Sequence, residues 1–168
     1  MGIAISLQQY LDGQGVAYEC VEHRRTGSSA SSAEASHVPA DSLAKAVVLK
    51  RRDGYILAIV PASRQVRLDD VGGWLHQMVG LATQEEIVSL FPDCAPGAVP
   101  PIAAAYGLRS LVDESLEGRS DIYFEGGDHR TLVHLSGDQF RKLMAKVPHG
   151  RISGENSIED GEYFYSGA

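Results

Sequence analysis

The stretch from Leu43 to Pro61 reads LAKAVVLKRRDGYILAIVP and contains two apolar, β-branched runs separated by a short polar segment. An Asp-Gly pair such as Asp53-Gly54 between two runs of this kind is a strong signal for a β-hairpin. Neither run alternates cleanly between apolar and polar residues, which is typical of strands that are covered on both faces. The sequence therefore predicts a buried hairpin at the centre of the fold.

Lys45 is unusual because it lies inside the first of these apolar runs. Successive strand residues point to opposite faces, so Lys45 shares a face with Val47 and Leu49. Two interpretations stay open at this point. The side chain either lays its apolar stem along the surface with its amine in water, or it places a partly desolvated cation at the mouth of a pocket for an anionic group.

The rest of the chain alternates short helical and strand patterns, without an internal repeat, a low-complexity tract or a linker. We expect one domain of the mixed α/β (α+β) class, with a mixed central sheet of about six or more strands surrounded by short helices. Residues 1–148 form this domain in our prediction, and residues 149–168 form a polar, acidic C-terminal tail with the aromatic residues 163–165 near its end. A helix is expected over residues 68–79.

Local signals place several helix starts and one rigid loop. Capping-box spacing occurs at Ser31 with Glu34, Thr83 with Glu86, and Ser136 with Gln139, and predicts a helix from each serine or threonine. Residues 92–101 contain four prolines and therefore form neither a helix nor a central strand. A glycine-rich turn, residues 126–129, separates two predicted strands.

Length and composition are those of an ordinary globular protein. The chain has 168 residues, of which 43% are hydrophobic and 22% are charged, enough for one domain with a sizeable core. No apolar run approaches the ~20 residues that a membrane span needs, and no signal peptide is recognisable. The two cysteines, Cys20 and Cys94, make neither a disulfide framework nor a metal-ligand pair. These features predict a reduced, cytoplasmic protein that does not interact with a membrane.

The charge of the chain is unevenly distributed. Its net charge is −7, which mildly disfavours nucleic acid as a partner. Residues 1–75 are balanced, however, with eight basic and eight acidic residues, whereas residues 76–168 carry the whole acidic excess. The basic residues near the hairpin form either a solvated tip or a locally positive rim.

The usual catalytic signatures are missing from the sequence. It contains no Gly-x-Ser-x-Gly elbow, phosphate-binding glycine loop or His-Glu-x-x-His motif. The six histidines lack ligand spacing, so we expect neither a metal site nor a cofactor. Cys94 is better explained as a small structural cysteine than as a nucleophile. The remaining candidates are Lys45, the Gly-Pro loop and His129, which would act by positioning and electrostatics.

Three segments together make the sequence similar to a known family. Residues 44–50 (AKAVVLK), 55–62 (YILAIVPA) and 97–101 (GAVPP) resemble, in order and register, the YbaK and prolyl-tRNA-synthetase-associated editing domains. The resemblance extends over roughly residues 5–147 and includes the Ser-rich helix start and the closing strand and helix. The acidic tail lies outside it.

The resemblance implies a free-standing aminoacyl-tRNA deacylase that serves translation fidelity by hydrolysing mischarged tRNA, most often alanine or another small amino acid on tRNA(Pro). Lys45 corresponds to the family's functional lysine, which holds the terminal adenosine or its phosphate. His129 corresponds to a histidine that shapes the pocket in some members. Lys45, Gly97 and His129 are therefore the implied catalytic residues, and the implied substrate-binding residues are Lys45, Gly97, Ala98, Val99, Pro100, Pro101 and His129.

The implied partners are the 3′ aminoacyl-adenosine end of mischarged tRNA and prolyl-tRNA synthetase, and a monomer is expected. Two other functions stay open: a catalytically silent module that binds tRNA or a nucleotide, and a synthetase-associated module that docks through its aromatic tail.

Overall fold

The predicted hairpin is the centre of the computed structural model, which describes residues 2–155 and 164–165. Its strands β2 (Ala44–Arg51) and β3 (Gly54–Pro61) pair antiparallel along their whole length. Gly54 adopts φ +134°, a backbone conformation that favours glycine, at the end of the turn. Away from the hairpin tip both strands are buried on both faces.

The hairpin belongs to a five-stranded mixed sheet with the order β5-β2-β3-β6-β9. β5 (Gly80–Leu81) pairs antiparallel with β2, whereas β6 (Arg109–Asp113) runs parallel to β3 and β9 (His149–Gly150) runs parallel to β6. This arrangement confirms the predicted mixed α/β class.

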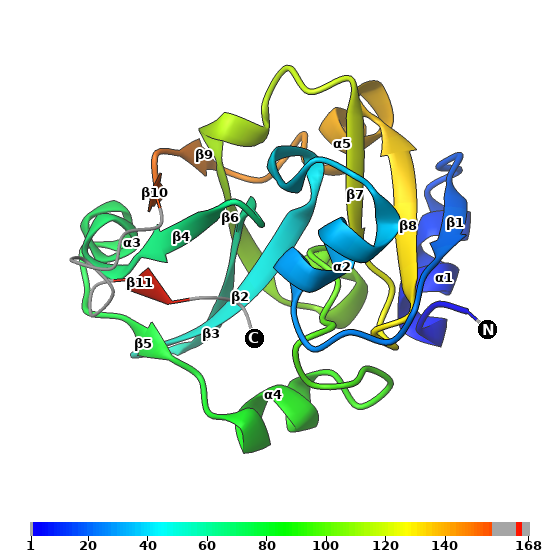
Figure 1. Ribbon diagram of the computed structural model, residues 1–168. Helices are drawn as coiled ribbons and strands as arrows, with labels where there is room; N and C mark the ends of the chain where they lie inside the picture. Colours follow the sequence, from blue (N-terminus) through cyan, green and yellow to red (C-terminus); the bar gives the residue numbers. More distant parts are fainter. Residues whose placement is uncertain (1, 156–163, 166–168) are drawn as a thin grey trace.

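Two smaller antiparallel sheets flank the central one (Figure 1). The first has the order β1-β8-β7, formed by β1 (Glu19–Glu22), β8 (Thr131–Ser136) and β7 (Asp121–Glu125). The second has the order β10-β4-β11, formed by β10 (Ser153–Glu155), β4 (Arg64–Arg67) and β11 (Phe164–Tyr165). The strands are thus divided among three sheets.

Short helices cover these sheets. The α-helices are α1 (Ile5–Gly13), α2 (Ser29–Ser36), α3 (Leu68–Leu75), α4 (Gln84–Leu90) and α5 (Gly137–Leu143). In the described part of the chain, three 3-10 turns join other elements, namely η1 (Ala40–Ser42), η2 (Ala103–Tyr106) and η3 (Glu114–Leu116). None of the helices in the described part of the chain is long and apolar enough to cross a membrane.

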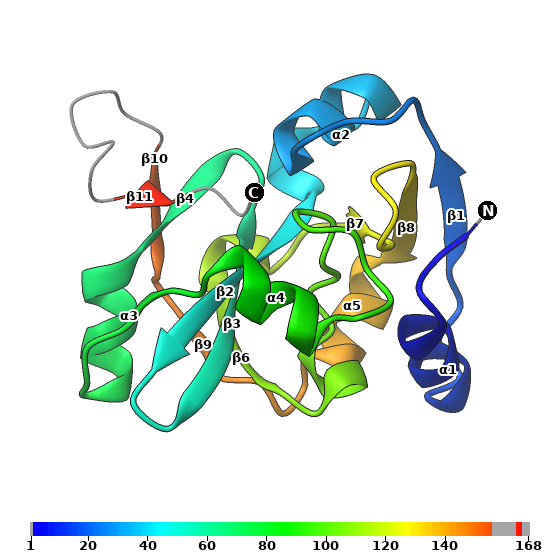
Figure 2. The same cartoon turned by 90° about the horizontal axis from the view of Figure 1, so that it is seen from below.

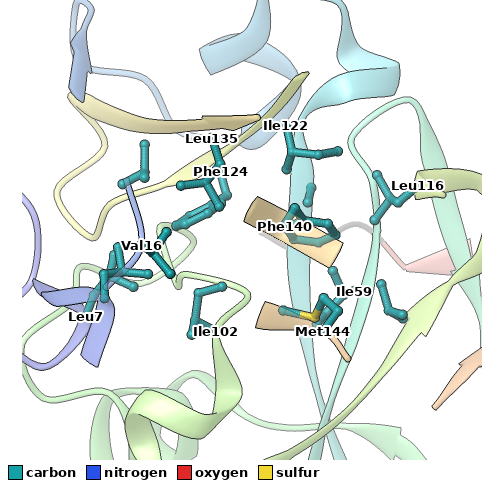
Figure 3. Packing of buried hydrophobic residues seen from close by; sticks show 14 of the residues in the cluster. Leu7, Val16, Ile59, Ile102, Leu116, Ile122, Phe124, Leu135, Phe140 and Met144 are labelled. Atoms are coloured by element: carbon teal, nitrogen blue, oxygen red, sulfur yellow. The ribbon is translucent and has the colours of Figure 1, made fainter. Parts of the chain in front are cut away.

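The main core lies between α1, the central sheet, β7, β8 and α5 (Figure 3). Phe124 and Phe140 belong to the same packed cluster as Ile59 of β3 and Leu7 of α1. A second cluster forms on the face of the central sheet that α3 covers, and a third forms under α4 and the proline-rich segment. A fourth packs α2 over the start of β2 through Ala33 and Leu43.

Some helix boundaries differ from the prediction. The N-cap of α2 is Ser28, whose Oγ accepts a hydrogen bond from the N–H of Ser31, so the prediction of a helix start at Ser31 was wrong. Several serines in a row offer equivalent caps, and the extended backbone of Ser28 decides between them. The helix expected over residues 68–79 ends at Leu75, because His76 adopts the left-handed conformation.

The segment after residue 148 contributes to the folded structure. β9 extends the central sheet, and β10 pairs with β4. Ile152 is fully buried, and its N–H donates to Asp113 Oδ1 at 2.9 Å. A boundary at residue 148 stays a prediction, and Tyr163 of the expected aromatic docking segment lies outside the described residues.

Candidate active site

Lys45 is a buried cation near the start of β2. Only 6% of its surface is exposed, and burial lowers the pKa of its amine from 10.5 to about 8. Among the described residues, its amine has no hydrogen-bond or ion-pair partner. Of the two interpretations of this lysine, the partly desolvated cation agrees with the structure. A buried, unpartnered cation is unfavourable for folding, which makes it a candidate for ligand binding.

The proline-rich segment lies against the same strand. Val99 packs in one apolar cluster with Ala46, Val48 and Leu57. Because strand residues alternate, Lys45 lies on the opposite face of β2 from Ala46. Within residues 2–155 no hydrogen bond or ion pair joins the Lys45 amine to the loop, so the two candidates are neighbours along β2 without a polar contact.

The loop itself presents unused backbone donors. Residues 96, 100 and 101 are prolines and have no N–H, so residues 97–101 hold only three backbone donors. The N–H of Ala98 donates to the carbonyl of Ala95 at 3.1 Å. The N–H groups of Gly97 and Val99 have no hydrogen-bond partner in the described part of the chain. Gly97 adopts φ +82°, a conformation that disfavours a side chain.

The start of the loop is anchored by side chains. Asp93 Oδ2 accepts a hydrogen bond from the N–H of Ser6 at 2.9 Å, and Asp93 Oδ1 accepts one from the Tyr106 hydroxyl at 2.8 Å. The Cys94 thiol lies 3.3 Å from the same hydroxyl. Burial raises the pKa of this thiol to about 12, so Cys94 is not a thiolate nucleophile at neutral pH, in agreement with the structural role expected for it.

His129 holds the middle of the loop. Its Nε2 hydrogen-bonds the carbonyl oxygen of Pro96, and the N–H of Ala95 donates to the carbonyl of Gly127 at 2.7 Å. A carbonyl only accepts, so Nε2 carries the proton. Nδ1 is buried and has no hydrogen-bond partner among the described residues. The structure thus brings His129 and the Gly97–Pro101 loop together through direct contact.

A buried polar chain beside this turn was not predicted. Ser32 Oγ of α2 donates to Glu125 Oε2 at 2.7 Å, and Thr26 Oγ1 lies 2.6 Å from Ser32 Oγ. The N–H of Thr26 in turn donates to the carbonyl of His129 at 3.2 Å. Burial raises the pKa of Glu125 from 4.5 to about 7. Glu125 directly follows the apolar residues of β7 in the sequence. A charged residue next to an apolar run is also the pattern that singled out Lys45.

These elements lie close together in the molecule. In Figure 2, α2, the segment after α4 and the turn between β7 and β8 lie on one side. Within the described residues, no three His, Cys, Asp or Glu side chains are grouped closely enough to hold a metal ion. The candidate groups are the Lys45 amine and, next to β2, the N–H groups of Gly97 and Val99 in the loop that His129 holds.

The comparisons with known proteins place this geometry in a family. The model of the aminoacyl-tRNA editing domain matches residues 23–143, a range that includes Lys45, the loop and His129. The chain belongs to the aminoacyl-tRNA editing domain family. A search of curated proteins found no match.

Solved structures show the same fold at low sequence identity. A candidate trans-editing enzyme for prolyl tRNA synthetase is 22% identical, with a TM-score of 0.77 over 90% of this chain and 96% of that chain. The hypothetical protein APE2540 is 20% identical, with a TM-score of 0.78 over 89% of this chain and 99% of that one. At these identities the likeness shows the fold alone.

Proposed function

We propose that this protein is a trans-editing aminoacyl-tRNA deacylase, which hydrolyses the ester of mischarged tRNA. Alanine or another small amino acid on tRNA(Pro) is the proposed substrate, and prolyl-tRNA synthetase, the source of such tRNA in the cytoplasm, is the proposed partner. The family membership supports the reaction class. The observation that carries the proposal is the pair of unused N–H groups at Gly97 and Val99 in a loop held by His129.

These donors suit the charge that develops in ester hydrolysis. When water attacks the ester carbonyl, its oxygen becomes negative, and backbone N–H groups already aimed at that position stabilise it. One such donor contributes on the order of 3 kcal/mol to lowering the barrier. Prolines on both sides of Gly97–Val99 limit the movement of the donors, so little reorganisation is needed during the reaction.

The remaining steps need only modest help from the protein. An aminoacyl ester is already activated, so water serves as the nucleophile. Collapse of the tetrahedral intermediate breaks the bond to the ribose oxygen, which leaves with a proton. The neighbouring ribose hydroxyl of the substrate assists the proton transfer. His129 acts as a positioning residue, because its hydrogen bond to Pro96 orients the peptide that precedes Gly97.

Lys45 is assigned to the phosphate of the terminal adenosine. An ammonium group is a compact point charge that suits such a contact. Binding of a phosphate near the amine raises the pKa of Lys45 again and removes the cost of its unpartnered charge. The lysine thus contributes to substrate binding and not to proton transfer.

Deacylation of a panel of mischarged tRNAs tests this function. Ala-, Cys- and Ser-tRNA(Pro) are incubated with the wild type, Lys45→Ala and the matched control Lys50→Ala, an exposed lysine of the same strand that pairs with Glu86 at 3.0 Å. We expect clear hydrolysis by the wild type and the control, and a loss of at least about tenfold in Lys45→Ala, as for a charged contact worth more than 1.4 kcal/mol. If no tRNA is cleaved above the buffer rate, the proposal fails and a silent binding module replaces it.

A further inference from the structure

A cavity of about 710 Å³ opens among residues of β2, β6, the 3-10 turn η2 and the end of α5. Its basic lining residues come from separate parts of the chain: Arg51 ends β2, Arg109 begins β6, and Lys142 and Lys146 belong to α5 and the segment after it. In Figure 2 the hairpin end of β2 and the chain after α5 lie on the side away from α2. Arg51 is about 20 Å from Lys45 along β2, at ~3.3 Å per residue.

The charge of this cavity is of one sign. Among the residues that the structure describes, no aspartate or glutamate lines it, although the whole chain carries a net charge of −7. None of its four basic side chains has an ion-pair partner in the described residues. Four like charges around one hollow repel one another and attract an anion, because a cleft concentrates the field of the charges that line it.

The floor of the cavity is apolar. Ile56, Ile102 and Met144 line it and are at least 96% buried, while Tyr10 and Leu108 are half-buried in its walls. Cavities of roughly 300–1,000 Å³ with apolar walls and a few charged groups are typical of sites for small organic ligands. A ligand that fits both features has a flat apolar part and several negative charges.

We propose that this cavity binds a nucleotide unit, with the base on the apolar floor and the phosphates among Arg51, Arg109, Lys142 and Lys146. A nucleoside diphosphate fits the charge and the size, and so does a segment of an RNA chain. The cavity borders the Gly97–Pro101 loop through Ile102 and Ala103, which follow the loop in the chain, but it is lined by none of the residues assigned to the deacylase reaction. The proposal therefore does not depend on the proposed deacylase activity.

Titration of the full chain with ADP, followed by calorimetry, tests the site directly. The variant is Lys142→Ala/Lys146→Ala. The matched control is Arg119→Ala/Arg141→Ala, which removes the same charge from cations outside the cavity that pair with Asp41 and Asp138. We expect the variant to weaken ADP binding at least tenfold and the control to leave it unchanged.

A parallel titration with uncharged tRNA at several salt concentrations distinguishes the source of the nucleotide. A plot of the logarithm of the tRNA association constant against the logarithm of the salt concentration has a negative slope. If the cavity holds RNA, this slope is shallower by about 1.4 in the variant, or ~0.7 for each lost phosphate contact with a single strand. If the variant loses ADP binding but binds tRNA as the wild type does, the ligand of the cavity is a free nucleotide. The proposal is overturned if both ligands bind the variant and the wild type equally.

Discussion

His129 Nε2 donates a hydrogen bond to the carbonyl oxygen of Pro96, and this contact joins the turn between β7 and β8 to the loop that presents the free N–H groups of Gly97 and Val99. The loop is therefore positioned by a side chain 33 residues away in sequence.

Replacing His129 tests this positioning role. His129→Asn keeps a residue that tolerates the positive φ of 62° but removes the ring contact. We expect kcat for mischarged tRNA to fall by roughly tenfold, the equivalent of about 1.4 kcal/mol, with little change in KM. The control is His76→Asn, an exposed histidine with φ 56° at the end of α3. Equal kcat values for the two variants would refute the role.

Gly97→Ala tests the backbone conformation of the loop. A side chain at φ +82° costs about 1–2 kcal/mol of stability and tilts the N–H groups that would bind the oxyanion. Gly107→Ala is the control, since Gly107 has φ +68° at the end of η2 and open space around its Cβ position. Both variants should lose similar stability in urea denaturation, but only Gly97→Ala should lose tenfold or more in kcat/KM.

Lys45→Met should stabilise the protein while abolishing activity. The folded-state pKa of about 8 lies below 10.5, so the charged lysine costs on the order of 3 kcal/mol at pH 7. Between pH 8 and 10.5 the unfolded chain keeps the proton of Lys45 and the folded chain does not. The free energy of unfolding of the wild type therefore rises with pH, and its difference from that of Lys45→Met becomes smaller. Denaturation at pH 7 and pH 10 measures this gap, and Lys50→Met, which removes an exposed ion pair with Glu86, should not stabilise the protein at either pH.

Glu125→Gln should have the opposite pH dependence. The folded-state pKa of Glu125, about 7, lies above 4.5, so between these values the folded state binds the proton and wild-type stability falls as pH rises. The wild type loses about 3 kcal/mol of unfolding free energy over this pH range. The variant should therefore be more stable than the wild type at pH 8 and equal to it at pH 4. A stability difference between the two proteins that does not change with pH would contradict the assignment.

Truncation tests the C-terminal segment. A chain that ends at residue 149 loses the buried Ile152 and its hydrogen bond to Asp113, so it should lose about 3 kcal/mol or fail to fold. A chain that ends at residue 155 keeps both contacts, although it loses β11 and its pairing with β4, so it should melt above the chain that ends at residue 149. Equal melting temperatures for the two chains would show that residues 149–155 contribute nothing.

Local signals explain what the sequence predicted correctly. The hairpin follows from Asp53-Gly54 between two apolar runs, and the capping box of Thr83 and Glu86 is present as expected. The burial of Lys45 was one of two open interpretations, because periodicity assigns a face and not a depth. The bond between Ser32 and Glu125 joins residues 93 positions apart, and a single sequence holds no signal for such a pair. The roles assigned to Lys45, Gly97 and His129 stay predictions.

The anchors of the Gly97–Pro101 loop have a consequence for the order in which the protein forms during synthesis. Asp93 is bound to the N–H of Ser6, near the start of the chain, whereas Pro96 is bound to His129, which comes 33 residues later in the sequence. The hairpin needs only neighbouring residues and can close early on the ribosome. The loop cannot be held in place until residue 129 has left the exit tunnel, so a nascent chain has its central strands before it has a competent site.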